Sequence, residues 1–522
     1  MTRATLHRWL PLLLLLLMAG AAWGLQAWWV VLDQGPPDSD EWHHLIKAQG
    51  YWLGWNRAGV SGLAHAMRLT QTTFPPLAHL GVLPWFDWAG GFSTDLALMS
   101  LGPWLAVLTI ACYGLGRRLA GPWAGLAAGA MGASAPLIVC LSRKFLLDLP
   151  LTAMVACCLW ALLASRQLSR PLLAWLAGLA FGLALLAKFI AGVYLLGAFA
   201  WLMLPAAWAC LRSWPKRGGA ALLVGALAIA LGLGLEHSQI QLWIAEFPDA
   251  DPPFLSWFTR ATVPLSLAWL WHGVGVLSIG LAVLAHRQEH PGLRALLAGS
   301  AALLAASWLA GCWYLPHLPR VIKGVAGFTA EGGAGEGDPT PGTMAGWTYY
   351  LWVLGHSLPR AWYHLLAVGV GASMLHPELR RRAGPLVGGL LFAYVLISLS
   401  TNKESRYTLA LLPTVVALAV GWTRLLPRWA QAVVLSLLAA SAITLSTSWV
   451  VVSRGGWRAQ PHQIWHDDRI ASSAVNTPMD HTFPGGVQAG ELLLPPPFWL
   501  VTPLPRQMPY SDTELPFHNF GP

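Results

Sequence analysis

Long apolar runs separated by short charged segments are the feature that most limits what this chain can fold into. Only 11% of its 522 residues are charged, whereas a soluble domain has roughly 25%. A helix that crosses a bilayer needs about 20 mostly apolar residues, and such runs recur from the amino terminus to residue 452. The pattern predicts an all-α polytopic membrane protein. It excludes a disordered, a collagen-like or an ordinary cytosolic protein.

About thirteen runs are apolar enough to be transmembrane helices. They lie at 9–32, 94–116, 121–141, 149–165, 171–187, 189–211, 218–235, 262–285, 294–312, 361–375, 385–400, 407–425 and 429–452. The first run follows two arginines, as in a signal peptide, but it is longer than a signal-peptide hydrophobic region. We therefore expect an uncleaved first helix.

The distribution of charge predicts the orientation. With the amino terminus in the cytoplasm, the cytoplasmic segments hold sixteen Lys or Arg residues and two acids, Glu289 and Glu378, which satisfies the positive-inside rule. The net charge of +9 comes from the Lys and Arg residues on the cytoplasmic side. It therefore does not indicate binding to nucleic acid, and no nucleic-acid partner is expected. The long outer segments are 33–93, 236–261, 313–360 and 453–522. Because the inner loops are short, we expect an active site that faces outward from the plasma (inner) membrane, toward the periplasm.

Two parts of the chain are expected. Residues 1–452 form a transmembrane domain, and residues 453–522 form a short Pro-rich outer tail. Within the domain, 33–93 is predicted to hold amphipathic helices on the membrane surface. Its apolar stretch 77–92 is expected to be an interfacial or re-entrant helix rather than a span. The segment 313–360 is predicted to contain a Gly-rich outer loop.

An acidic cluster, DSDEWHH, directly follows the first predicted span. It contains Asp40 and Glu41, with His43 and His44 after them. Carboxylates in a half-buried cleft at a membrane face suit a general base or a divalent-cation site. The alternative is a solvated helix start in which Ser39 or Asp40 caps the first turn.

Several charged residues fall at the outer ends of predicted spans. They are Arg143, Lys144, Asp148, Lys188, Lys403 and Arg406. Arg143 and Lys144 oppose the orientation rule because their hairpin is expected to face outward. These cations either extend toward lipid headgroups or bind an anionic phosphate delivered from the membrane.

A series of short motifs runs in order along the chain: the acidic pair, TTFPPL, SRKFLLDLPLT, LLAKFIAG, CWYLPHLPRVI and ESRYTLALLP. In this order and topology, the sequence resembles the GT-C integral-membrane glycosyltransferases. It looks most like bacterial relatives of the dolichyl-phosphate-mannose protein mannosyltransferases, a family 39-like group that includes the lipid A aminoarabinose transferases. The similarity covers residues 9–425.

The resemblance implies an enzyme that transfers a hexosyl or pentosyl unit, with inversion, from a polyprenyl-phosphate donor to an acceptor outside the membrane. The acceptor class stays open among protein, lipid and glycan. The resemblance implies that Asp40 is the general base and that Glu41 assists it. It also assigns Asp148, Lys188 and Arg406 to the carrier phosphate. Together with Arg143, Lys144 and Lys403, these residues make up the expected phosphate site.

Two other functions stay open from the sequence. A lipid or glycolipid transporter or flippase would use intramembrane charges to mark a path, and a non-catalytic partner would only bind glycolipid. Charges at the outer ends of spans favour the enzyme. No cofactor or metal ligand is assigned. A divalent cation, Mg or Mn, stays open because the Asp and His residues named above lack a diagnostic ligand spacing.

Overall fold

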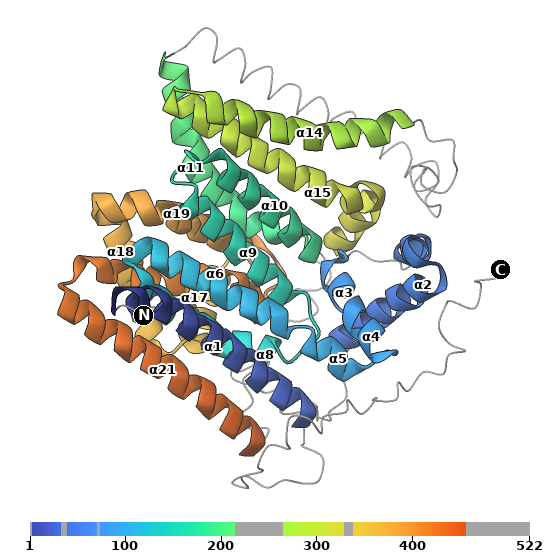
Figure 1. Cartoon of the computed structure of the whole chain (residues 1–522), viewed down its shortest axis with the longest axis horizontal. Helices are drawn as coiled ribbons and strands as arrows, with labels where there is room; N and C mark the ends of the chain where they lie inside the picture. Colours follow the sequence, from blue (N-terminus) through green and yellow to red (C-terminus); the bar gives the residue numbers. More distant parts are fainter. Residues whose placement is uncertain (1–2, 33–38, 70–73, 214–264, 328–337, 456–522) are drawn as a thin grey trace.

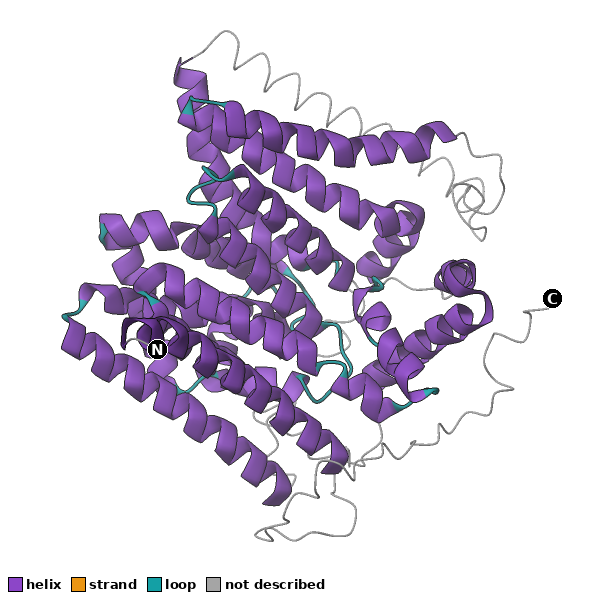
Figure 2. Ribbon diagram, in the orientation of Figure 1, coloured by secondary structure: helices purple, strands orange, loops and turns teal. Residues whose placement is uncertain are grey.

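The computed structural model of this chain describes residues 3–32, 39–69, 74–213, 265–327 and 338–455. All regular structure in these ranges is helical (Figure 2), which confirms the predicted all-α class. The predicted span 218–235, the outer segment 236–261 and nearly all of the tail 453–522 lie outside the described residues, as does part of the Gly-rich loop.

The described helices follow the apolar runs closely. They are α1 (Arg3–Leu32), α2 (Ser39–Leu69), α3 (Leu77–Gly81), α4 (Leu83–Ala89), α5 (Thr94–Met99), α6 (Gly102–Ala120), α7 (Pro122–Ser134), α8 (Pro136–Leu141), α9 (Asp148–Ala164), α10 (Pro171–Ala187), α11 (Ala191–Ser213), α14 (Leu265–Arg287), α15 (Pro291–Gly327), α17 (Met344–Ser357), α18 (Arg360–Leu375), α19 (Pro377–Leu399), η2 (Ser405–Leu411), α20 (Leu412–Gly421), η3 (Trp422–Leu425) and α21 (Arg428–Gly455).

Membrane-spanning length is reached by fewer segments than predicted. Among the described residues, six helical segments are long and apolar enough to cross a membrane. They are Leu10–Val31, Thr94–Ala120, Ala191–Ser213, Pro291–Tyr314, Pro377–Leu399 and Ser405–Leu425. Five more apolar helices are shorter, including α9 and α10. The multi-pass character is confirmed, whereas the count of thirteen spans is not.

The predicted span 121–141 is divided into α7 and α8. Ala135 is extended, with ψ of 125°, because the ring of Pro136 disfavours a helical conformation in the residue before it. Pro136 then occupies the first turn of α8, where its missing N–H costs no helical hydrogen bond. The predicted span 294–312 is shorter than the helix observed there, since α15 continues to Gly327.

The centre of the bundle is closely packed. All ten residues of α20 are buried, and α20 packs against α6, α7, α9 and α18. Glycine allows close approach between α6 and α7, since a Cβ atom on Gly116 would lie 2.6 Å from the Ala124 carbonyl oxygen. Small residues at helix contacts are typical of membrane bundles.

The segment 33–93, predicted to lie outside the membrane, contributes a group of helices that packs against the bundle. Figure 1 shows α2, α3 and α4 gathered beside one end of the bundle. Helix α2 bends at Ala58 and Gly59, where Gly59 has a φ of +55°. The two halves fold back on each other, so that a Cβ atom on Gly62 would lie 2.0 Å from the Gly54 carbonyl oxygen. This segment therefore contains helices, as predicted, and α3 and α4 are short helices rather than spans.

Candidate active site

The acidic pair lies in the first turn of α2, where the positive end of the helix dipole favours carboxylates. The two side chains differ in exposure. The Asp40 side chain is 55% exposed, whereas Glu41 is 6% exposed. Glu41 Oε1 accepts a hydrogen bond from the Phe145 backbone N–H at 2.9 Å. Glu41 therefore fixes the turn before α9, and Asp40 keeps its carboxylate open to solvent.

That turn, residues 142–147, is held from two sides. Gln26 of α1 donates from Nε2 to the Ser142 carbonyl oxygen at 3.0 Å. Arg143 is buried, and its guanidinium lies 4.7 Å from the centre of the Trp29 ring, in a cation–π contact. Lys144, the next predicted cation, is half-buried in the same turn. Helices α1 and α2 thus fix the position of the segment that leads into Asp148.

Asp148 and Lys188 form a buried ion pair. Asp148 begins α9 and Lys188 directly follows α10, and these two packed helices bring both residues to the same end of the bundle. Lys188 Nζ donates to Asp148 Oδ1 at 2.8 Å, and the side chains are only 10% and 5% exposed. Charges this buried need a partner to offset their lost hydration. The acidic neighbour that the sequence near Lys188 lacks is therefore supplied 40 residues earlier.

Arg406 connects the first outer segment to a late part of the chain. It lies in η2, and its Nη1 donates to Asp40 Oδ2 at 2.8 Å. Its Nη2 donates to Glu404 Oε1, also at 2.8 Å. The negative charge of Asp148 acts on the Arg406 guanidinium as well. Four segments that are distant in sequence therefore meet at one place, with three carboxylates and two cations.

Lys403 has different partners from the other predicted cations. Its Nζ donates to the carbonyl oxygens of Ser398 and Ser400, each at 2.7 Å, and the residue is 1% exposed. Lysines at a helix carboxyl terminus bind the last carbonyls in this way. The backbone N–H of Lys403 donates to Asp338 Oδ2 at 2.7 Å. The Lys403 ammonium thus caps the carboxyl-terminal end of α19.

A histidine pair lies beside the ion pairs, and His79 within it was not predicted. His44 Nδ1 and His79 Nε2 are 3.2 Å apart and buried. Burial lowers the pKa of His79 to about 3. Burial, and then the positive charges of Lys47, Lys188 and Arg406, hold the pKa of His44 well below 6.5. Both rings are therefore neutral near pH 7, and one donates to the other.

Lys47 adds a further cation that sequence analysis did not assign to the site. Its ammonium lies 4.6 Å from the centre of the Phe74 ring, and burial lowers its pKa to about 8. Glu404 was also missed as a site residue, although it lies two residues before Arg406 in the same motif. The only sequence signal for His79 is a single histidine inside the apolar stretch 77–92.

The arrangement can bind an anion by exchange. Arg406 and Lys188 already pair with carboxylates, so a phosphate would have to compete with Asp40, Glu404 or Asp148 for their hydrogen bonds. Asp40 is the most exposed of these partners. Among the described residues, no group of three or more His, Cys, Asp or Glu side chains is placed to hold a metal ion.

Comparisons with solved structures find weak likenesses to two proteins. ArnT from Cupriavidus metallidurans bound to undecaprenyl phosphate is 14% identical, with a TM-score of 0.45 over 86% of this chain and 69% of that one. The oligosaccharyltransferase AglB from Archaeoglobus fulgidus, in complex with an inhibitory peptide and a dolichol-phosphate, is also 14% identical, with a TM-score of 0.45 over 97% of this chain and 62% of that one. This chain therefore spans less than two thirds of AglB. No curated protein matches the sequence significantly.

A family model gives the more direct assignment. Residues 97–234 match the model described as dolichyl-phosphate-mannose-protein mannosyltransferase. The matched segment contains Asp148 and Lys188, the two halves of the buried ion pair. Over this segment, the match confirms the resemblance to the dolichyl-phosphate-mannose protein mannosyltransferases that the motifs indicated.

Proposed function

We propose that this protein transfers a sugar, with inversion, from a polyprenyl-phosphate donor to an acceptor on the outer side of the membrane. The observation that carries the proposal is the Arg406 guanidinium, which bridges Asp40 and Glu404 at the end of the bundle where Lys188 pairs with Asp148. A base and phosphate-binding cations therefore lie close together. Protein, lipid and glycan acceptors are all compatible with this arrangement.

These contacts support the following reaction. The acceptor oxygen attacks the anomeric carbon on the face opposite the phosphate, and its proton passes to the Asp40 carboxylate. The bond between the anomeric carbon and the phosphate oxygen breaks, and its electron pair leaves with the phosphate. Arg406 and Lys188 stabilise the charge of the departing phosphate. The protein needs no covalent nucleophile because a lipid phosphate is a sufficient leaving group.

Exchange of partners at Arg406 would couple donor binding to the base. Arg406 Nη1 donates to Asp40 Oδ2 at 2.8 Å. A donor phosphate that takes over this hydrogen bond releases the Asp40 carboxylate to face the acceptor hydroxyl. Asp148 has a supporting role, because a carboxylate repels a phosphate and its Oδ1 orients the Lys188 ammonium.

The test compares purified wild type with Asp40→Asn in detergent, using a radiolabelled polyprenyl-phosphate hexose and extracted envelope material as acceptor. Loss of a general base typically lowers the rate by about 10² to 10⁴. We expect Asp40→Asn to lower kcat by this amount, with a smaller change in the KM for the donor. Asp87→Asn is the matched control, because Asp87 lies in the same outer segment and accepts from Trp52 Nε1 at 2.9 Å, which an asparagine can also do.

Arg406→Gln separates binding from chemistry. Because Arg406 is proposed to hold the phosphate, this variant should raise the KM for the donor as well as lower kcat. Equal transfer by wild type and Asp40→Asn would refute the assignment of the base. If no variant and no wild-type preparation transfers label, with several sugars and with added Mg or Mn, the transferase proposal fails. Flipping of the intact lipid would then be measured in vesicles.

A further inference from the structure

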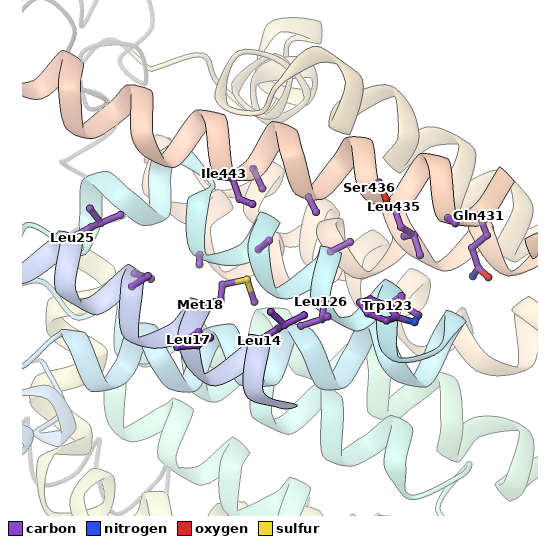
Figure 3. Close-up of a pocket in the computed structure, with 18 of the residues that line it drawn as sticks. Leu14, Leu17, Met18, Leu25, Trp123, Leu126, Gln431, Leu435, Ser436 and Ile443 are labelled. Carbon is purple, nitrogen blue, oxygen red and sulfur yellow. The ribbon is translucent and has the colours of Figure 1, made fainter. Parts of the chain in front are cut away.

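A long apolar groove lies away from the candidate active site, between α1, α7 and α21 (Figure 3). Its volume is about 930 Å³, which is within the usual range for a ligand-binding pocket. Leu14, Leu17 and Leu25 line it from α1, and Leu435 and Ile443 line it from α21. Its polar lining residues are few and include Arg428, Gln431 and Ser436.

Small side chains create the hollow. α1 and α21 both pack on α7, and α7 lines the groove between them with Ala127, Ala130 and Ala133. Alanines also line it from α21, including Ala439. The floor of the groove is therefore formed by alanines of α7, and its two sides are formed by leucines of α1 and by α21. Figure 3 shows Leu14, Leu17 and Ile443 along this space.

The part of the groove lined by α1 and α7 matches one leaflet of a bilayer in length, and on α21 the lining continues over about 22 Å, from Arg428 to Ile443. At 1.5 Å per residue, Leu14 to Leu25 spans about 16 Å and Trp123 to Ala133 spans about 15 Å. The hydrocarbon core of a bilayer is about 30 Å thick, so one leaflet contributes about 15 Å. An extended acyl chain lying parallel to the helices would fill the part of the groove between α1 and α7, with the start of α21 beyond its end.

One end of the groove is positively charged. Arg428 is the first residue of α21 and is exposed. Gln431 Nε2 donates to the Ala120 carbonyl oxygen at 3.1 Å, which places this end of α21 beside the last turn of α6, where Arg117 and Arg118 lie. A cation in the first turn of a helix is repelled by the positive end of the helix dipole, and a bound anion would offset this repulsion.

Two helix amino termini meet at the same end. α7 begins at Pro122, directly after α6, and neither α7 nor α21 has an acidic residue in its first turn. Their first backbone N–H groups have no partners within the helix and favour an anion. Trp123 lines this end of the groove, and tryptophan is enriched at the level of lipid headgroups.

We propose that this groove binds one acyl chain of an anionic phospholipid, with the headgroup phosphate held by Arg428 at the start of α21. The site is distinct from the ion-pair cluster, because the charges of Arg166 and Arg170 act on Arg118 at the end of α6, beside which Arg428 and Gln431 lie. Asp148 and Lys188 lie at one end of α9 and α10, and Arg166 and Arg170 lie at the other. The phospholipid is therefore a bound component of the scaffold rather than the sugar donor, and its binding does not depend on the proposed function.

The test counts bound lipid by native mass spectrometry of the full chain in non-ionic detergent. The probes are dioleoyl phosphatidylglycerol and dioleoyl phosphatidylcholine, which share acyl chains and differ in net charge. Wild type should bind the anionic lipid more tightly by about tenfold, which corresponds to about 1.4 kcal/mol. Arg428→Gln should lose this preference, and Arg428→Lys should recover most of it. Arg380→Gln is the control, because Arg380 is an exposed arginine of α19 that does not line the groove.

A second variant separates the acyl chain from the headgroup. Ala439→Phe fills the groove and should reduce binding of both lipids, whereas raised salt should weaken only the anionic lipid. Far-UV circular dichroism and size-exclusion elution confirm that each variant is folded. Equal binding of the two lipids by wild type would overturn the proposal, and so would unchanged binding by Ala439→Phe. Displacement of phosphatidylglycerol by an equimolar polyprenyl phosphate would assign the groove to the carrier instead.

Discussion

The buried ion pair between Asp148 and Lys188 allows a quantitative prediction. Two single variants, Asp148→Asn and Lys188→Met, each remove one charge, and the double variant removes both. Lys188 Nζ and Asp148 Oδ1 are 2.8 Å apart, and both side chains are almost fully buried. Removing one partner of a buried pair typically costs about 3 to 5 kcal/mol, because the other charge is left without compensation.

The two single variants should lose different amounts of stability. Asp148→Asn leaves the Lys188 ammonium buried near Arg406, so it should reach the upper part of that range. Lys188→Met leaves the Asp148 carboxylate buried, but the positive charge of Arg406 still acts on it. This variant should therefore lose less stability than Asp148→Asn. The double variant should be more stable than Asp148→Asn, with a coupling free energy of about 2 to 3 kcal/mol.

The measurement is equilibrium unfolding in mixed micelles, titrated with SDS and followed by far-UV circular dichroism. Arg382→Gln is the control, because it breaks an exposed pair with Glu378 at 3.2 Å that should contribute less than about 1 kcal/mol. If the two single costs simply add in the double variant, the pair is not coupled and the reasoning is refuted. A stable double variant without transferase activity would further indicate that Lys188 acts on the donor and not only on the fold.

Three further predictions concern other residues. Burial gives His79 a pKa of about 3, so below pH 6.5 the unfolded chain binds a proton that the folded chain does not, and stability should fall by up to about 1.4 kcal/mol per pH unit. Thermal unfolding against pH should show a shallower acid decline for His79→Phe than for wild type, whereas the exposed control His272→Gln should behave as wild type. Lys47, with a pKa of about 8, loses its charge as pH rises through 8, so the KM for the donor should increase there in wild type but not in Lys47→Arg. A Cβ atom on Gly178 would lie 2.1 Å from the Ala302 carbonyl oxygen, so Gly178→Ala should destabilise by about 1 to 3 kcal/mol in SDS unfolding, whereas Gly280→Ala, with open space around it, should not.

Helix positions were predictable because hydropathy is a local property of the chain. The runs 171–187 and 9–32 match α10 and α1 closely, since each is a long apolar stretch bounded by charge or proline. The predicted single span 121–141 was wrong in detail because Pro136 ends one helix and begins another. The sequence shows that proline, but only the packed structure decides whether a proline in an apolar run bends a helix or divides it.

Four charged residues that the structure brings together were selected from the sequence, but their partners were not. Asp40, Asp148, Lys188 and Arg406 all stood out because charge at the end of an apolar run is costly and therefore unusual. Lys403 stood out by the same criterion, although its ammonium binds the last carbonyls of α19. Local sequence cannot distinguish a cation that ends a helix from one that faces a ligand.

The sequence alone determined that this chain is a multi-pass helical membrane protein with an acidic pair and several cations at the ends of its spans, because hydropathy and charge act residue by residue. The tertiary structure decided which charges meet. Asp40 reaches Arg406 across 366 residues, and Glu41 is turned inward to Phe145 while its neighbour stays open. These pairings arise because helix packing brings the ends of α2, α9, α10 and η2 together. The spacing of these residues along the chain does not show which of them are in contact.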